Sequence, residues 1–225
     1  MHGFRQILSV LGTCACVSAG AGSLGVAPLK VTLSATAPIG SVTVENSGSA
    51  DILVQTEIFS WSQSDGIQNL AATDDVVAVP PVFKLAPGAQ QLVRVGLTRA
   101  FVESYEKTFR LMVTEVPTAT LTQTVAVSIR HSLPVFVLPE KASAGTLGVR
   151  ADSVGLQIAN EGNQHVNIRR WRVRDASGAV VVDANGPGYV LRGERRSIAI
   201  AKAIAGPLVF EADTASGTLK IPVGP

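Results

Sequence analysis

The sequence predicts an all-β fold made of two sandwich domains. Apolar and β-branched residues alternate with polar ones along most of the chain, and turn-forming residues interrupt them about every ten residues, as in β-sandwiches. No stretch of ten or more residues has the 3.6-residue period of an amphipathic helix, which disfavours a parallel sheet with crossover helices. With 46% hydrophobic and 16% charged residues, the 225-residue chain has enough apolar side chains for two domains of about 100 residues each.

Residues 1–21 are interpreted as a cleaved export signal. Arg5 provides the positive charge, residues 7–19 are apolar, and small residues at 19–21 form the cleavage site. Both cysteines of the sequence lie in this segment, so the mature chain is expected to contain no disulfide. Two alternatives are a membrane anchor, for which the apolar run is short, and a lipoprotein, for which the residue before Cys14 is unsuitable.

Five strands are predicted in the first domain, each with period-two alternation or a β-branched run. They are residues 41–45, 52–59, 91–97, 109–113 and 122–129. Turn signals at Asn46-Ser47-Gly48, Asp65-Gly66 and Ala86-Pro87-Gly88 support their boundaries.

The second domain repeats this pattern. Its predicted strands are residues 155–159, 166–174, 180–183, 197–201, 207–211 and 218–221. Ser177-Gly178 and Asn185-Gly186 are predicted turns. The small polar segment 139–143 is the predicted linker, which divides the mature chain into a first domain of residues 22–138 and a second domain of residues 144–225.

Composition and motifs argue against several functions. A formal net charge of +2 without a cluster of Lys and Arg disfavours nucleic acid as a partner. We interpret His131 as an exposed strand histidine, His165 as a loop histidine and Asp74-Asp75 as a solvated turn, because none has the neighbours that a metal site or a catalytic triad requires. We therefore expect no catalytic residue, metal, cofactor or small-molecule substrate.

One segment is unusually long and apolar. Residues 121–137 form an extended stretch of seventeen residues, whereas a strand usually has about 5 or 6. At a sheet edge such a strand invites another chain to pair with it, and β-strand addition to an incomplete sheet of a partner would use that tendency. The alternative is that its row of apolar side chains faces the core of its own domain.

Five stretches of the first domain have a characteristic order and spacing. They are residues 26–33, 44–55, 80–94, 106–117 and 132–137, and include Pro80-Pro81-Val82-Phe83-Lys84-Leu85 and Ser132-Leu133-Pro134-Val135-Phe136-Val137. Together they resemble the first domain of the periplasmic pilus-assembly chaperones of the chaperone/usher pathway. The short connection at 117–121 and the last stretch are similar to the short-loop, archaic branch. The resemblance covers residues 26–139 and implies two immunoglobulin-like sandwiches set in an L, with a subunit in the cleft.

The resemblance also implies roles for single residues. The long strand is similar to the family's donor strand, which fills a groove that a pilin leaves open for lack of its last strand. The donor residues would be Leu121, Gln123, Val125, Val127 and Ile129.

Two cations are implied to anchor the C-terminal carboxylate of the subunit. Lys30 matches an arginine with this role in the family, and a solvated lysine is the alternative. The family's second anchoring lysine matches Pro134, so Arg130 is the nearest substitute. Strict alternation places Arg130 on the opposite face from Ile129, so its role would need a bulge or a strong twist.

Two further sets of residues match functional surfaces of the family. Glu106 and Asp213 match members of an interdomain charge cluster, whose arginine is replaced here by Leu138. Leu53 and Arg94 match part of the usher-docking surface, and an ordinary buried leucine and exposed arginine are the alternative.

These observations together favour a periplasmic chaperone that captures pilin subunits by donor-strand complementation and delivers them to an outer-membrane usher. When empty, the exposed donor strand would favour self-association. The competing hypotheses are an exported structural or adhesive module without a client subunit and, third, an enzyme that acts on carbohydrates.

Overall fold

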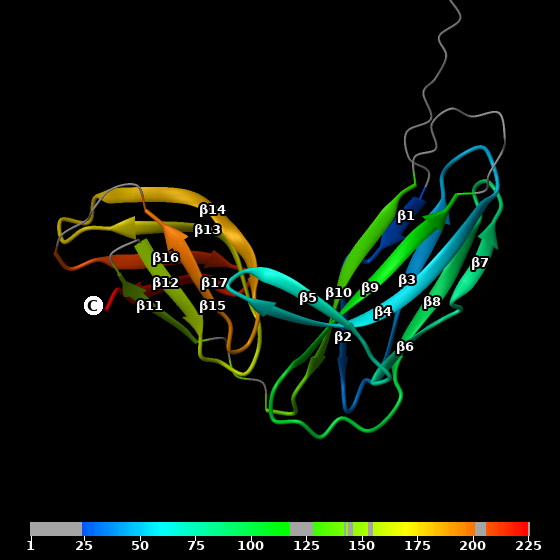
Figure 1. Cartoon of the computed structure of the whole chain (residues 1–225), viewed down its shortest axis with the longest axis horizontal. Coiled ribbons are helices and arrows are strands. Elements are labelled where there is room, and N and C mark those ends of the chain that lie inside the picture. Colours follow the sequence, from blue (N-terminus) through cyan, green and yellow to red (C-terminus); the bar gives the residue numbers. More distant parts are fainter. Residues whose placement is uncertain are drawn as a thin grey trace, which may run out of the picture.

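The computed structural model describes residues 24–117, 128–141, 143, 146–152, 155–200 and 206–224. In these residues the chain forms seventeen strands and no helix. Within the same ranges, nothing forms a helix long and apolar enough to cross a membrane. Figure 1 shows two sandwiches set at an angle, with the first at the right and the second at the left, so that the molecule has the shape of an L. The predicted all-β class and two-sandwich architecture are thus confirmed.

The first sandwich consists of two sheets. One has the order β1 (Leu24–Ala27), β3 (Ile39–Asn46), β8 (Gln90–Leu97) and β6 (Val76–Val79). The other has the order β2 (Val31–Ser34), β10 (Arg130–Leu138), β9 (Lys107–Val116), β4 (Ile52–Ser64) and β5 (Ile67–Ala72), with β7 (Val82–Leu85) also paired to β4. All pairs are antiparallel except β2 with β10.

The second sandwich is built in the same way from two antiparallel sheets. One has the order β11 (Leu147–Ala151), β12 (Gly155–Asn160) and β15 (Arg195–Ala199). The other has the order β14 (Val180–Val190), β13 (Val166–Arg174), β16 (Val209–Thr214) and β17 (Gly217–Pro222). The predicted linker at 139–143 falls between β10 and β11.

Each sandwich has its own core, formed by alternate residues of its strands. On β3, for example, Val42 and Val44 are completely buried while Ser41 and Glu45 are exposed. Since successive side chains of a strand point to opposite faces, period two in the sequence becomes one buried and one outer face. Each such buried Val or Leu contributes roughly 1.5–3 kcal/mol to stability, which the disulfide-free mature chain predicted above depends on.

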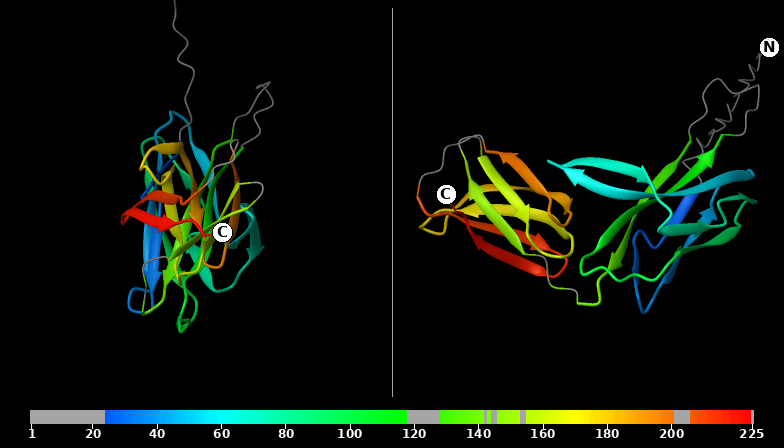
Figure 2. Two further views of the ribbon diagram at one scale, coloured as in Figure 1. Left: turned by 90° about the vertical axis from the view of Figure 1, so that its left-hand side faces the viewer. Right: turned by 60° about the horizontal axis from the view of Figure 1, so that its bottom comes forward.

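A third, smaller apolar cluster joins the two domains. It consists of Trp61, Phe136, Leu138, Tyr189 and Leu191. The β4–β5 hairpin also reaches from the first sandwich to the second (Figure 2). In it, the Gln63 amide donates to the Tyr189 carbonyl at 3.0 Å and accepts from the Leu191 N–H at 3.0 Å.

The described part of the first domain has ten strands where five were predicted, and two further sequence-based expectations change in the structure. The strand predicted at 122–129 lies mostly outside the described residues, and β10 begins only at Arg130. The turn predicted at Asn185-Gly186 is wrong, because both residues lie inside β14, where the register with β13 shifts. A Cβ at Gly186 would come within 1.9 Å of the Ile168 carbonyl oxygen, so this glycine permits an irregular, close strand contact there.

A buried asparagine closes a loop in the first sandwich. Asn46, the last residue of β3, has no exposed surface. Its side-chain amide donates to the carbonyls of Ala50 at 2.8 Å and Leu85 at 3.1 Å, and its Oδ1 accepts from the Gly48 N–H at 3.0 Å. One side chain therefore satisfies three backbone groups and ties the end of β3 to the end of β7.

The second sandwich repeats this device. Asn160, the last residue of β12, donates to the carbonyls of Gln164 at 2.7 Å and Val190 at 2.9 Å and accepts from the Gly162 N–H at 3.0 Å. The sequence offsets of two and four residues are the same in both domains. Each sandwich therefore contains the same set of asparagine hydrogen bonds at the end of a strand.

Replacing Asn46 or Asn160 by alanine is expected to lower the free energy of unfolding of that domain by about 2–5 kcal/mol, because each change removes the partners of two carbonyls and one N–H. Urea unfolding followed by circular dichroism and tryptophan fluorescence measures this. Asn69→Ala, at an exposed position of β5, is the matched control and should change stability by less than about 0.5 kcal/mol. Equally small effects for all three variants would contradict the assignment.

Candidate functional site

The sheet that contains β10 has one face toward the core of the first domain and one face toward the angle between the domains (Figure 1). We call the second face the cleft face. It carries alternate residues of three strands: Phe59 of β4, Arg110 and Met112 of β9, and Arg130, Ser132, Pro134 and Phe136 of β10. Near the second domain the cleft face is covered, since Phe136 is completely buried and its ring lies 5.4 Å from that of Tyr189.

β10 has a free edge over its first half. β9 pairs with it from Arg130 to Val137, whereas β2 pairs only with the segment from Val135 to Leu138. Within the described residues, no strand pairs with the other edge of β10 between Arg130 and Pro134. The backbone N–H and C=O groups along this edge are therefore placed where a strand of another chain could pair with them.

The donor row predicted from the sequence is described only at Ile129. Leu121, Gln123, Val125 and Val127 lie outside the described residues. Ile129 is half-buried against the first core, and its carbonyl accepts a hydrogen bond from the Glu115 N–H at 2.8 Å. The same parity continues into the buried side chains of Leu133, Val135 and Val137. In its described part, the row thus faces the core of its own domain.

Lys30, Pro134 and Arg110 occupy one row across the sheet. Pro134 is paired with Arg110 on β9, and Lys30 immediately precedes Val31, which is paired with Val135. Lys30 is exposed. Adjacent strands lie about 4.8 Å apart, so the backbones of Lys30 and Arg110 are about 10 Å apart, with the proline between them. Two cationic side chains therefore flank Pro134, the position at which the resemblance implies a lysine.

Arg110 is a functional candidate that the sequence analysis missed. Its guanidinium lies over the ring of Trp61, 3.7 Å from the centroid, and donates to the Gln68 side-chain oxygen at 3.3 Å. Its Nε is buried and has no hydrogen-bond partner within the described residues. Burial lowers the pKa of this guanidinium, and the neighbouring Tyr189 opposes that shift. Since a guanidinium is not deprotonated in proteins, the side chain stays cationic.

Arg130 lies on the cleft face without a bulge. The register between β10 and β9 is uninterrupted from Arg130 to Val137, so alternation alone places Arg130 on the same face as Pro134. The expected need for a bulge or strong twist is therefore removed. Its side chain is exposed and its Nε donates to Thr114 Oγ1 at 3.1 Å. Four residues separate it from Pro134, about 13 Å along the strand.

Glu106 and Asp213 have different partners and do not form one charge cluster. Glu106 is buried between the domains, where it binds His165 of the second domain. Asp213 is within the second domain and is bound by Arg172 at 2.7 Å, which, with the Thr218 hydroxyl, lowers the pKa of its carboxyl. Leu138, where the resemblance implies an arginine, packs in the interdomain apolar cluster.

Leu53 and Arg94 lie on different sheets. Leu53 is half-buried on β4, beside Lys84 of β7 and Val116 of β9. Arg94 is exposed on β8, in the sheet that contains β3 and β6. The structure does not bring these two side chains into contact.

His131 and Asp75 are less exposed than expected, whereas Asp74 is exposed as predicted. His131 is half-buried, and its Nε2 lies 2.8 Å from the Leu24 carbonyl oxygen. Asp75 is half-buried and is bound by Lys107 at 3.1 Å and by Arg99. The Lys107 hydrogen bond, with the charge of Arg99, lowers the pKa of the Asp75 carboxyl.

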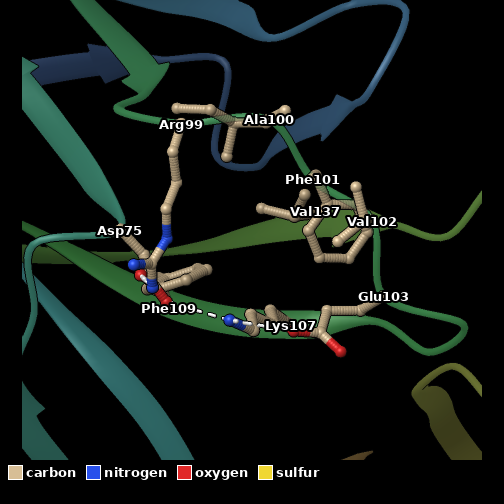
Figure 3. A pocket seen from close by; sticks show the side chains of 10 residues that line it. Asp75, Arg99, Ala100, Phe101, Val102, Glu103, Lys107, Phe109 and Val137 are labelled. Atoms are coloured by element: carbon tan, nitrogen blue, oxygen red, sulfur yellow. Dashed lines mark hydrogen bonds and ion pairs between the residues drawn. The ribbon is translucent and has the colours of Figure 1, made fainter.

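Asp75 stands at the rim of a small pocket at one end of the first sandwich (Figure 3). Phe101, Phe109 and Val137 line its apolar part. Its volume of about 170 Å³ is smaller than the roughly 300–1,000 Å³ of pockets that hold drug-sized ligands. The pocket is therefore a weaker candidate for a binding site than the cleft face.

Comparison with solved structures places this fold among pilus chaperones. A chain of the CsuC-CsuE chaperone-tip adhesion subunit pre-assembly complex from archaic Csu pili of Acinetobacter baumannii has a TM-score of 0.70 and 21% identity, over 91% of this chain and 100% of that one. A chain of the Salmonella enterica SafA pilin in complex with the SafB chaperone has a TM-score of 0.66 and 16% identity, over 89% of this chain and 96% of that one. The E. coli chaperone DraB has a TM-score of 0.63 and 17% identity, over 90% of this chain and 98% of that one. At these identities the likeness establishes the fold.

Sequence comparison gives the family itself. A search of curated protein sequences finds no match. The family model described as "Pili and flagellar-assembly chaperone, PapD N-terminal domain" matches residues 23–143, which is more than half of the chain. The resemblance inferred from the five stretches of the first domain is thereby confirmed. The chain belongs to the family of pili and flagellar-assembly chaperones with a PapD N-terminal domain.

Proposed function

We propose that this protein is a periplasmic chaperone that binds pilin subunits at β10 by donor-strand complementation and delivers them to an outer-membrane usher. The observation that carries the proposal is the free edge of β10 beside a cationic cleft face. Two of the similar structures are complexes of a chaperone with a pilus subunit, which supports a pilin as the partner.

Two kinds of interaction supply the affinity. Backbone groups of the free edge pair with a strand of the subunit, and side chains of one parity enter the subunit's open groove. The proposed side chains are those of the donor row: Leu121, Gln123, Val125, Val127 and Ile129. Each buried branched side chain is worth roughly 1.5–3 kcal/mol, so the row could hold a subunit that is unstable alone. Because the described part of the row continues the first core, a seated subunit would extend that core.

The cations of the cleft face receive the C-terminal carboxylate of the subunit. Lys30 and Arg110 flank Pro134 in one row, and Arg130 lies further along the same face. A guanidinium presents several N–H donors to a carboxylate, and a charge-assisted hydrogen bond is about twice as strong as a neutral one. The carboxylate would also fix the register of the added strand, because it marks the end of the subunit's chain.

Subunit release needs no nucleotide. A donor strand that fits the groove imperfectly is replaced by a better-fitting strand from the next subunit, and the lower free energy of that product drives the exchange. The usher contacts are proposed at Leu53 and Arg94, which lie apart on the first domain.

Co-purification tests the function as a whole. The tagged chain is expressed in a periplasm together with each small exported protein encoded beside its gene. We expect one such protein to be recovered in a one-to-one complex and to be degraded when expressed alone. Recovery of the tagged chain without any client would favour the structural or adhesive module instead.

Val127→Asp is expected to abolish recovery of the subunit, because a carboxylate would enter an apolar groove without a partner. The matched control is Val180→Asp, which makes the same change at an exposed position of the second domain. Recovery of the subunit and the circular dichroism of the purified variant are measured together. If Val127→Asp unfolds the chaperone itself, its side chain belongs to the core and the donor assignment fails.

Lys30→Gln and Arg110→Gln are each expected to weaken binding of a synthetic peptide from the client's last strand by about tenfold, the loss typical of one hydrogen bond to a charged group. The same peptide with an amidated C-terminus should bind wild type and variants alike. Titration calorimetry measures both peptides. Arg94→Gln removes a cation from the other sheet and is the control. Equal weakening for acid and amide would contradict the carboxylate site.

A further inference from the structure

The two domains meet at a buried carboxylate held by a single histidine. The Glu106 side chain has no exposed surface. The backbone N–H of His165 donates to Glu106 Oε1 at 3.0 Å, and the ring Nδ1 lies 2.9 Å from Oε1 and 2.8 Å from Oε2. Since an ionised carboxylate can only accept, Nδ1 must carry the hydrogen. Two donors of one residue in the second domain thus satisfy a carboxylate of the first.

Aromatic rings fix the imidazole in this position. It stacks on Phe136 with a centroid distance of 3.7 Å and an angle of 17° between the planes, and Tyr189 meets it at 5.3 Å and 67°. Leu138 packs in the same cluster, at the position where the resemblance implies an arginine. An apolar side chain therefore occupies that position, and a histidine from another loop faces the carboxylate.

The backbone around the pair joins the domains independently of charge. The Glu106 N–H donates to the Asn163 carbonyl at 2.9 Å, and the Asn163 side-chain amide donates to the carbonyls of Ser104 at 3.1 Å and Lys141 at 2.9 Å. None of these donors and acceptors changes its charge with pH, so they favour the docked arrangement equally at pH 5.5 and pH 8. Protonation of His165 changes only whether a positive charge balances the buried negative charge of Glu106.

Other charged groups near Glu106 have partners of their own. In the described ranges, no lysine or arginine forms an ion pair with Glu106. Lys107 forms an ion pair with Asp75 at 3.1 Å, and Glu194 accepts a hydrogen bond from the Gly66 N–H at 2.7 Å. The guanidinium of Arg192 lies 4.1 Å from the centroid of the Tyr105 ring, and that of Arg110 lies over the Trp61 ring. His165 is thus the group whose charge is positioned to offset that of Glu106.

We propose that Glu106 and His165 form a proton-dependent clamp that sets the angle between the domains. Imidazole changes charge between about pH 5 and 8, unlike a guanidinium, which is always charged. With His165 protonated, the buried carboxylate has a full counter-charge and the domains are held together. As pH rises and the proton leaves Nε2, the carboxylate keeps its two hydrogen bonds from His165 but loses the counter-charge. His165 is therefore a positioning residue for the cleft. Its effect on subunit capture rests on the proposed chaperone function, whereas the clamp itself does not.

The clamp can be tested on the empty protein. Cysteines are introduced at the exposed positions Ala35 and Ala176, one in each domain, and spin-labelled in the mature chain. Pulsed electron paramagnetic resonance then measures the interdomain distance distribution at pH 5.5 and pH 8. We expect a narrow distribution at pH 5.5 and, at pH 8, an increase of at least about tenfold in the undocked population, the order of effect that an opposite charge within about 4–6 Å has on a carboxylate.

Variants separate the clamp from a general effect of pH. His165→Gln and Glu106→Gln should give the same distribution at both pH values, and His165→Arg, whose charge is permanent, should stay narrow at pH 8. His131→Gln and Glu103→Gln, a histidine and a carboxylate with partners in the first domain, should respond like the wild type. The proposal is overturned if the wild type does not respond to pH or if His165→Gln responds like the wild type. Neither result depends on whether a subunit binds.

Discussion

The alternation of side chains along β10 is the constraint on which the rest of the structure depends. Leu133, Val135 and Val137 face the core of the first domain, whereas Pro134 and Phe136 face the cleft and the second domain. The uninterrupted register with β9 keeps this division intact over the whole strand. A one-residue slip would exchange the two faces, so that the core, the cleft face and the domain interface would be lost together.

The two edges of β10 differ in how much of their length is paired with other strands. One edge is fully paired with β9, which holds the strand in the sheet. The other edge is paired with β2 only at its last residues, and no other strand of the described ranges pairs with its first ones. An open, apolar edge is a liability in most proteins. In this chain the open edge lies next to cations of the cleft face, a combination suited to a strand that ends in a carboxylate.

The domain interface combines an apolar contact with a buried charge. Leu138, where the resemblance implies an arginine, belongs to the apolar and aromatic cluster that joins the domains. The buried carboxylate of Glu106 remains and takes its hydrogen bonds from His165. A buried charge without a partner is strongly destabilising, so the two donors of His165 stabilise this interface.

The sequence by itself determined the class of fold, the family and most of the longer strands, because alternation, turn residues and the order of short motifs are local properties. It also placed Lys30 and Arg130 as cations near β2 and β10. β5 is exposed at every residue and β6 is apolar at every residue, so neither alternates between apolar and polar side chains. Asn185-Gly186 has the composition of a turn although it lies within β14. Only the tertiary structure decided that Arg110 stands beside Pro134, because cross-strand register joins residues far apart in the chain. The pairing of Glu106 with His165 likewise depends on how two separate domains dock, which no local pattern encodes.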